Sequence, residues 1–407
     1  MASFEKKPND PVVVGMGRTA VGRIRGSLST IRPDDLLGYV FQSLAERSGI
    51  DVSQIDEVFA GCANQAGEDN RNVARMALLL AGFPQAVPGV TVNRLCASGL
   101  EAVIMASRAI RCQDMNLCVA GGVESMSRAP FSMAKSETGF PIGAPAIFDT
   151  SLGWRFPNPR LEALFPLEQM GQTAENLVSE YGISREDQDA FAYNSHQKAL
   201  AAQASGAFDA EIIPIEIKHR KKPTVLFQQD EGPRSDTTLE KLATLRPAFK
   251  KEGGSVTAGN SSTLNDGAAA LAICSREYAE TNGLSIYGAI RGGSSAGVNP
   301  RTMGIGPVPA TEKLLQRTGL AVGDIDAFEL NEAFAAQSLA VIRSLDIPEE
   351  KVNLHGGAIA MGHPLGCSGA RILISLINIL EKQSGRLGVA TLCVGVGQGV
   401  SLLFERE

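Results

Sequence analysis

The chain has 407 residues, of which 44% are hydrophobic and 20% are charged, and its formal net charge is −6. These values are ordinary for a globular protein with a large core, and the acidic balance argues against nucleic acid as a partner. The sequence shows neither the apolar stretch of a secretory signal nor an apolar run long enough to span a membrane.

The first predicted element is a helix over residues 34–49, because apolar residues recur at helical spacing and Gly49 supplies a C-terminal stop. A strand-like apolar run precedes Cys96, and the small residues that follow it predict a second helix. Residues 117–122 form a short apolar run that ends in glycine, as buried strands do. This alternation of strands and helices predicts mostly parallel sheets covered by helices.

Residues 127–285 are richer in proline, charge and irregular segments than the rest of the chain. Their most regular part is a helix-like pattern over residues 185–204. Such an insertion usually forms a lid or a binding platform.

An internal repeat flanks this insertion. Residues 44–61 match residues 314–331 at an offset of 270 positions. The identical pairs are Leu44/Leu314, Arg47/Arg317, Gly49/Gly319, Val52/Val322, Ile55/Ile325 and Asp56/Asp326. The same offset pairs Ser98–Gly99 with Ser368–Gly369, and residues 117–122 with 387–392. We interpret the repeat as an ancient duplication of one α/β unit.

The repeat aligns residues that can carry chemistry. The loop that holds Cys96 aligns with the loop that holds His363. The strand end at residues 121–125 aligns with the strand end that holds Cys393, and Asn331 lies at the end of another repeated strand. Equivalent strand ends of a pseudo-symmetric α/β body lie near each other, at the edge where such folds bind ligands. We therefore predict that these four residues converge.

The types of these residues suit nucleophilic catalysis. Cys96 precedes a helix, whose N-terminus favours a thiolate, so we expect this thiolate to be more available than that of a free thiol. His363 lies in a constrained loop and could accept the thiol proton. Cys393 lies beside glycines whose backbone N–H groups can approach a substrate oxygen, and Asn331 can donate a hydrogen bond to a second oxygen. The structural alternative is that both cysteines fill a core and that His363 caps a helix.

The remaining cysteines and histidines are interpreted as structural or incidental. Seven cysteines at scattered spacings, with no CxxC pair, argue against a disulfide framework and a structural zinc site, which favours a reducing, cytoplasmic setting. The residues left without a role are Cys62, Cys112, Cys118, Cys274, Cys367, His196, His219 and His355.

Six segments together resemble the thiolase family over nearly the whole chain: residues 93–103, 121–131, 256–270, 331–337, 356–371 and 392–399. The resemblance implies a five-layer αβαβα fold from two duplicated α/β halves plus an inserted loop domain. The expected divisions are an N-terminal half at 1–126, completed by about 256–285, an inserted CoA-binding loop domain at 127–255, and a C-terminal half at 286–407. It also implies acyl-CoA and CoA as substrates, no metal or tightly bound cofactor, and a homodimer or homotetramer.

In this family two cysteines, a histidine and an asparagine cut or make a 3-oxoacyl-CoA. The resemblance implies that Cys96 is the acylated nucleophile, that His363 activates it and the incoming CoA thiol, and that Cys393 is the acid/base at the acetyl α-carbon. Asn331, through water, and His363 would serve one oxyanion, and the N–H groups of Cys96 and Gly395 would serve the other.

The resemblance also implies contacts to CoA. Phe249 would meet the adenine and Arg234 the nucleotide end. The pantetheine channel would be lined by Met170, Ala258, Ser262, Leu264 and Phe334. The chain departs from many biosynthetic relatives at Gln169, Ser261 and Thr263, where those have His, Ala and Gly.

Residues 146–159 and 393–399 resemble the branch that cleaves 3-oxoadipyl-CoA in aromatic-compound breakdown. The alternatives are a general acetyl-CoA acetyltransferase or fatty-acid β-oxidation thiolase, a decarboxylating ketoacyl synthase, and a non-catalytic acyl-CoA-binding relative. A terminal carboxylate held away from water needs a cationic partner. Arg155 is the first candidate, followed by Arg128 and Arg160, and the alternative is that Arg155 is solvated or structural.

Overall fold

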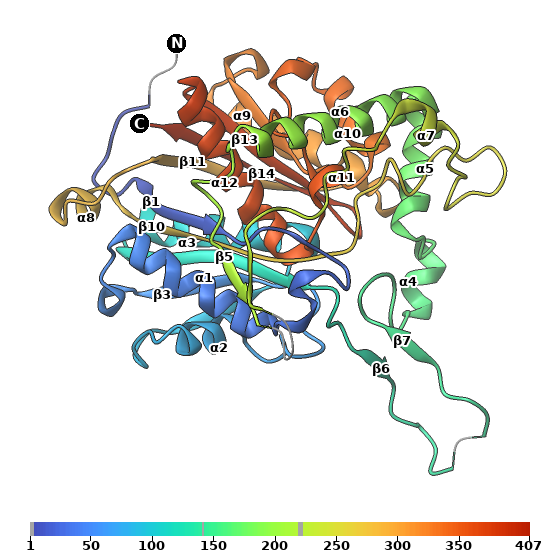
Figure 1. The fold of residues 1–407 in the computed structure, drawn as a ribbon, viewed down its shortest axis with the longest axis horizontal. Helices are drawn as coiled ribbons and strands as arrows, with labels where there is room; N and C mark the ends of the chain where they lie inside the picture. The colour runs from blue at the N-terminus through green and yellow to red at the C-terminus, as the bar shows by residue number, and fades with distance from the viewer. Residues whose placement is uncertain (1–3, 141, 219–222) are drawn as a thin grey trace.

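The computed structural model describes residues 4–140, 142–218 and 223–407. In that part of the chain a ten-stranded sheet runs in the order β12-β13-β14-β11-β1-β10-β5-β3-β4, and β2 (Gly22–Arg23) pairs with β10. The two halves join at β1 and β11, where Val12 and Val13 face Ala289 and Gly288. Figure 1 shows the blue N-terminal half below the red C-terminal half.

The N-terminal half contains most of the elements before residue 126 and one strand from beyond the insertion. Its elements are β1 (Pro11–Arg18), α1 (Pro33–Ser48), β3 (Glu57–Gly61), α2 (Val73–Leu80), β4 (Gly89–Val92), α3 (Ser98–Arg111), β5 (Leu117–Ser125), β10 (Asn265–Ser275) and α8 (Arg276–Thr281).

The C-terminal half repeats this arrangement. Its elements are β11 (Gly288–Gly297), α9 (Pro307–Thr318), β12 (Ala327–Leu330), α10 (Ala335–Ser344), α11 (Ala358–Met361), α12 (Leu365–Gln383), β13 (Leu387–Val394) and β14 (Gln398–Arg406). The starts of β5 and β13, Leu117 and Leu387, keep the offset of the sequence repeat.

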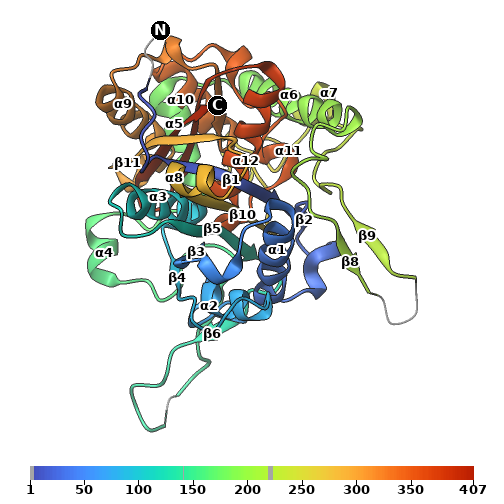
Figure 2. The same cartoon turned by 90° about the vertical axis from the view of Figure 1, so that its left-hand side faces the viewer.

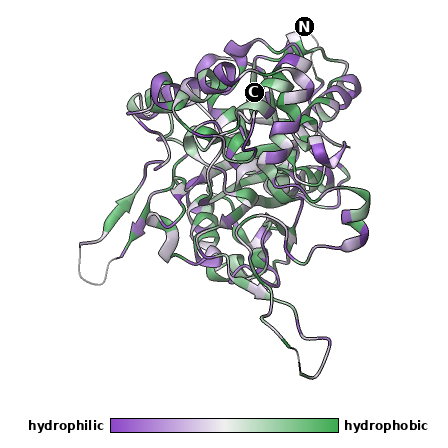
Figure 3. Cartoon of the chain, turned by 90° about the vertical axis from the view of Figure 1, so that its right-hand side faces the viewer, coloured by the Kyte–Doolittle hydropathy of each residue, from purple (hydrophilic) through white to green (hydrophobic). Residues whose placement is uncertain are grey.

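Helices α3 and α12 lie between the two parts of the sheet and pack on strands of both halves. Helices α1 and α2 cover the outer face of the N-terminal half, and α9 and α10 cover that of the C-terminal half. The expected αβαβα layering is therefore confirmed. The second apolar cluster combines inner strands of both halves with α3 and α12, and Figure 3 shows hydrophilic and hydrophobic residues mixed on the helices at the surface.

The expected mostly parallel pairing is wrong. Only β3–β4, β3–β5 and β12–β13 pair in parallel within the described strands, and the remaining pairs of the large sheet are antiparallel. The short turn between Val394 and Gln398 returns β14 directly beside β13, and a tight turn can join only antiparallel neighbours. The prediction of parallel pairing rested on strands that alternate with helices. It did not cover β10 and β14, because neither strand directly follows a crossover helix.

The inserted region packs around the right-hand edge of Figure 1. The β6–β7 pair leads into a long projecting loop, and β8–β9 forms a second projecting hairpin (Figures 1 and 2). The elements are β6 (Phe131–Met133), β7 (Ile147–Asp149), α4 (Pro159–Leu164), α5 (Met170–Tyr181), α6 (Arg185–Ala204), β8 (Ile215–Ile217), β9 (Val225–Phe227) and α7 (Leu239–Ala243). No helix in the described ranges is both long and apolar enough to cross a membrane.

Glycines allow α3 and α12 to cross with their backbones nearly in contact. A Cβ at Gly99 would lie 2.6 Å from the carbonyl oxygen of Gly366, and one at Gly369 would meet the backbone N of Leu100. The repeated Ser-Gly pair of the sequence thus marks the point where the two helices touch. This crossing brings the N-terminal ends of both helices to one place.

We expect Gly369→Ala to destabilise the fold by roughly 1–3 kcal/mol, because the new methyl group overpacks a backbone contact that cannot relax. This loss should exceed the gain from the higher helix propensity of alanine. The measurement is chemical denaturation beside Gly323→Ala, a control position with no atom within 4 Å of the added Cβ. Equal stability of the two variants would contradict the close crossing.

Candidate active site

Cys96 lies in a short 3-10 turn, Leu95–Ala97, that leads directly into α3, and it is half-buried. Leu95 has a φ of 48°, a left-handed conformation that leucine rarely adopts. Its N–H donates to Asn93 Oδ1 at 2.9 Å, and the Ser98 hydroxyl donates to the Leu95 carbonyl at 2.6 Å. These two bonds hold the strained turn and therefore the direction of the thiol.

The turn after β13 faces this thiol. The backbone N–H of Gly395 is near enough to the Cys96 sulfur to lower the pKa of the thiol, and the Cys393 thiol is near enough to interact with it electrostatically. A Cβ at Gly395 would lie 3.1 Å from Leu95 Cδ1, so a side chain there would press on the Cys96 turn. The backbone N–H groups of Cys96 and Gly395 thus flank one side of the nucleophile.

His363 and Asn331 form a second polar pair. Asn331 Nδ2 lies 3.4 Å from His363 Nε2, and His363 Nδ1 lies 2.7 Å from the Ser368 hydroxyl. When that hydroxyl donates to the Pro364 carbonyl, 2.9 Å away, His363 Nδ1 must carry the hydrogen. Nε2 then carries the lone pair, which accepts from Asn331 Nδ2, and this is the tautomer a general base requires.

The loop that carries His363 is fixed by Asn265. The His363 backbone N–H donates to Asn265 Oδ1 at 3.0 Å, and Thr263 Oγ1 donates to the same oxygen at 2.8 Å. The preceding Gly362 has a φ of 110°, and a Cβ there would overlap the Asn265 amide. Only glycine fits at this point of the loop.

Burial determines the charge state of the unliganded site. Burial, with a contribution from Arg371, lowers the pKa of His363 to about 3. Burial raises the pKa of Cys96 to about 11, although the N–H groups of Gly395 and Cys96 act in the opposite direction. Burial also raises the pKa of Cys393 well above its ordinary value, with Cys96 as the second cause. All three groups are therefore neutral at physiological pH.

The expectation of a more available Cys96 thiolate is consequently wrong for the resting site. Removing the sulfur from water outweighs the helix N-terminus and the neighbouring N–H groups. At physiological pH the unliganded site therefore holds Cys96 as a thiol.

An apolar cluster surrounds Cys393 and contains three of the residues expected to contact CoA. Phe249 and Phe334 meet edge to face, with centroids 6.2 Å apart and an interplanar angle of 88°, and Met170 packs beside them. The N–H of Ser262 donates to the Ala333 carbonyl at 3.0 Å, which joins this segment to the cluster.

A separate groove of about 360 Å³ contains the other expected contacts, Arg234, Ala258 and Leu264. Arg23 lines it from the N-terminal half, whereas Lys241 lines it from the inserted region. The groove is therefore lined by both cationic and apolar residues. Phe249 is not among the lining residues and lies instead in the cluster at Cys393, so its contact with adenine stays a prediction.

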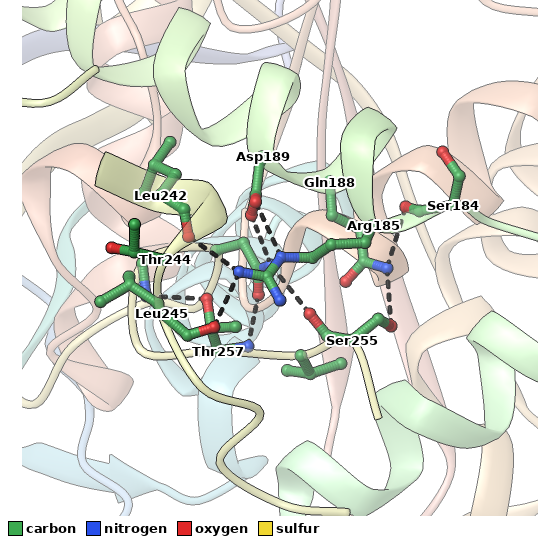
Figure 4. A network of polar contacts seen from close by, with 12 residues as sticks. Ser184, Arg185, Gln188, Asp189, Leu242, Thr244, Leu245, Ser255 and Thr257 are labelled. Carbon is green, nitrogen blue, oxygen red and sulfur yellow. Dashed lines mark hydrogen bonds and ion pairs between the residues drawn. The ribbon is translucent and has the colours of Figure 1, made fainter. Parts of the chain in front are cut away.

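A polar network supports the wall of this groove (Figure 4). Arg185 donates from Nε to Asp189 at 2.7 Å and from Nη2 to the carbonyls of Leu242 and Leu245 at 2.8 and 3.0 Å. Gln188 donates to the Ser255 hydroxyl at 2.9 Å. Helix α6 thereby holds α7 and the strand-like segment before Ala258 as one unit.

Several supporting residues were missed in the sequence. Glu124 accepts backbone N–H groups from Ala63, Asn64 and Gly366 at 3.0, 3.1 and 2.8 Å, which links the loops of both halves, and burial raises its pKa to about 7. The repeated Ser-Gly pair was a usable signal for Ser368, whereas no pattern indicated Asn265 or Glu124.

The residues interpreted as structural are mostly buried. Cys62, Cys118, Cys274 and Cys367 are buried, whereas Cys112 is exposed at the end of α3. His196 accepts a hydrogen bond from the Arg234 N–H at 3.2 Å, and His355 packs edge-on against Phe208. His219 lies outside the described residues.

Comparisons with known proteins agree over the whole chain. A profile of the thiolase N-terminal domain matches residues 11–277, and a profile of the thiolase C-terminal domain matches residues 284–406. A "Beta-ketoadipyl-CoA thiolase" from Pseudomonas aeruginosa is 56% identical, and a "3-oxoadipyl-CoA/3-oxo-5,6-dehydrosuberyl-CoA thiolase" from Escherichia coli is 51% identical, each over 96% of this chain and 97% of its own length. The crystal structure of the Bacillus anthracis acetyl-CoA acetyltransferase has a TM-score of 0.93 and 44% identity, and the match covers 99% of this chain and 100% of that one.

We expect iodoacetamide to alkylate exposed Cys112 without loss of activity, and alkylation of Cys96 to parallel inactivation. Because the pKa of Cys96 is raised to about 11, its alkylation rate should rise about tenfold per pH unit between about pH 7 and 9. Peptide mass spectrometry beside residual activity measures both, and Cys112→Ser removes the exposed competitor. A Cys96 rate that is already constant at neutral pH would show that the thiolate is stabilised after all.

Proposed function

Because the chain belongs to the thiolase family, it is an acyltransferase, and we propose that it uses CoA to cleave 3-oxoadipyl-CoA into acetyl-CoA and a shortened acyl-CoA. The observation that carries this proposal is that the turn of Cys96 packs against β13, which holds Cys393, and against α12, which follows His363, while His363 contacts Asn331. The names of the more similar relatives support 3-oxoadipyl-CoA over acetoacetyl-CoA as the substrate.

The first half-reaction forms an acyl-cysteine. The Cys96 sulfur attacks the 3-oxo carbon while its proton passes to His363 Nε2, and the new oxyanion is faced by the N–H groups of Cys96 and Gly395. The bond between the α-carbon and the 3-oxo carbon then breaks. Its electron pair forms the enolate of acetyl-CoA, whose oxygen is faced by His363 and, through water, by Asn331. The Cys393 S–H delivers a proton to the α-carbon.

The second half-reaction transfers the acyl group to CoA. The proton on His363 first restores Cys393, a direction favoured because burial lowers the pKa of the imidazole and raises that of the thiol. The CoA thiol then gives its proton to His363 as it attacks the acyl-cysteine. Collapse of the tetrahedral intermediate releases the Cys96 sulfur, which takes the proton back from His363.

The CoA molecule would lie along the groove and the apolar cluster. Arg234 at the groove suits the nucleotide end, while Ala258, Leu264, Ser262, Met170 and Phe334 lead toward Cys393. We propose that residues 127–255 form the CoA-binding part of the fold, with CoA as a co-substrate. We further propose a cytoplasmic homodimer or homotetramer, and the seven free cysteines suit a reducing compartment.

Arg155 is the best of the three candidates for the terminal carboxylate. It is half-buried and has no carboxylate partner in the described part of the chain, whereas Arg128 pairs with Glu68 and Arg160 is exposed. Its Nη2 donates to the Asn64 carbonyl at 2.8 Å. A half-buried guanidinium without a counter-ion is suited to a carboxylate supplied by the substrate.

A short series of contacts connects Arg155 to the nucleophile. Arg155 binds Asn64, the adjacent Ala63 carbonyl accepts from Asn93 Nδ2 at 3.1 Å, and Asn93 Oδ1 holds the Leu95 N–H beside Cys96. The segment that carries Arg155 therefore lies next to the Cys96 turn, where a short acyl chain on the sulfur could reach it.

We expect Cys393→Ser to keep acetylation of Cys96 measurable and to slow acetoacetyl-CoA thiolysis by roughly 100-fold or more, because only the second process needs a proton at the α-carbon. Cys96→Ser should impair both. The measurement is mass spectrometry of the protein after exposure to acetyl-CoA, beside thiolysis rates. Near-normal thiolysis by Cys393→Ser would make Cys393 a packing residue.

For the substrate, we expect Arg155→Ala to lower kcat/KM for 3-oxoadipyl-CoA by about 10- to 100-fold and to change that for acetoacetyl-CoA much less, since a charged hydrogen bond is lost only with the first. Arg160→Ala is the matched control and should change neither. An equal loss for both substrates would mean that Arg155 only holds the Asn64 loop.

A general acetyl-CoA acetyltransferase is the second candidate, because the solved structure with that name is 44% identical. The same four residues would serve both reactions. A panel of 3-oxoacyl-CoA substrates with and without a terminal carboxylate separates the two functions.

A further inference from the structure

A buried ion pair lies directly behind the site. Glu329 of β12 and Arg371 of α12 are each 1% exposed, and Arg371 Nη1 lies 3.7 Å from Glu329 Oε2. Neither residue has a role in the mechanism described above.

The pair joins the same two elements as the catalytic contact. Phe328 and Leu330 face the outer core, so strand alternation directs Glu329 and Asn331 toward α12. On α12, Ser368 and Arg371 are three residues apart and share one face. The contacts of Asn331 with His363 and of His363 with Ser368 thus connect the end of β12 to α12. The Glu329–Arg371 pair connects the same two elements at the adjacent position.

The geometry of the pair is poor for stability. Glu329 Oε1, Arg371 Nε and Arg371 Nη1 are buried without a hydrogen-bond partner among the described residues. Buried charges that lack hydrogen bonds lose more free energy by desolvation than a separated ion pair returns, and apolar residues can often replace such a pair without loss. Stability alone therefore does not account for it.

The charges are placed to act on His363. The guanidinium of Arg371 is the one charged group that lowers the pKa of His363, besides burial. Burial raises the pKa of Glu329 to about 8. The groups that face Glu329 are Arg371 from α12, Glu332 after β12, Glu211 before β8, and Lys198 from α6.

Resting on the proposed thiolase reaction, we propose that Glu329 and Arg371 are positioning residues that set the proton affinity of His363. Ionised Glu329 neutralises the guanidinium, so His363 can accept the proton of Cys96 or CoA. Protonated Glu329 leaves the positive charge unbalanced, and it then opposes formation of the imidazolium. The pair also holds β12 and α12 in the register at which Asn331 meets His363.

The sign of the pH dependence follows from this arrangement. As pH rises through about 8, Glu329 loses its proton, the local charge becomes more negative, and His363 becomes a stronger base. The rate of Cys96 alkylation in the wild type should therefore show an ionisation near that pH, in addition to the rise with pH that ionisation of Cys96 itself causes. Glu329→Gln keeps the shape of the side chain but cannot ionise, so it should lack this step.

The experiment compares Glu329→Gln, Glu329→Gln/Arg371→Gln and the wild type. Acetoacetyl-CoA thiolysis gives kcat and KM, and the rate of Cys96 alkylation by iodoacetamide across pH gives a profile without the CoA thiol. Above pH 8, where wild-type Glu329 is ionised, we expect Glu329→Gln to lower kcat about tenfold with little change in the KM for CoA, and to lack the step near pH 8. The double variant, which removes both charges, should recover most of the rate in the same pH range.

Arg371→Lys and Glu405→Gln are the controls. Arg371→Lys keeps the charge and should keep the step, whereas Glu405→Gln disturbs the Arg291–Glu405 ion pair, 2.6 Å apart and remote from the site, and should change thermal stability only. Failure of the wild type to cleave both 3-oxoadipyl-CoA and acetoacetyl-CoA would contradict the proposed function and leave the alkylation profile as a separate test. A step that persists in Glu329→Gln, or a double variant slower than the single one, would overturn the proposed role of the pair.

Discussion

The site depends on the close crossing of α3 and α12. Gly99 and Gly369 let the two backbones touch, and Gly122 of β5 also lies against the Gly366 carbonyl, so a side chain at any of these positions would separate the helices. Both helices begin at the crossing. Cys96 precedes one helix and His363 precedes the other, and the turn of Cys96 packs against α12 at this crossing. The two copies of the duplicated unit therefore contact each other closely beside the candidate site.

Close packing at the crossing also removes water from the reacting groups. The consequence is a resting site in which the thiols of Cys96 and Cys393 keep their protons and His363 is a neutral imidazole. A neutral site needs little free energy to remain buried, whereas a permanent thiolate–imidazolium pair would need strong compensation. Charge then develops only when a substrate carbonyl is present, in front of N–H groups that are already oriented.

The inserted region contributes side chains beside the candidate site. It supplies Arg234 and Lys241 to the groove and Met170 and Phe249 to the cluster at Cys393, while Arg155 donates to the Asn64 carbonyl of the N-terminal half. The strands of this region that the structure describes pair only with each other and not with the large sheet. If the proposed roles hold, the catalytic residues and the residues that select the substrate lie in different parts of the chain.

The sequence alone was enough to predict the duplication, the layered α/β class and the four residues proposed for catalysis. Repeated segments, strand ends and glycine positions are local patterns, and equivalent strand ends of a duplicated unit are expected to lie near each other. The antiparallel pairing of β10 and β14, the elevated pKa of Cys96 and the pairing of Glu329 with Arg371 emerged only from the folded structure. Each of these depends on which distant groups surround an atom and on how much water they exclude, and that information is absent from the spacing of residues along the chain.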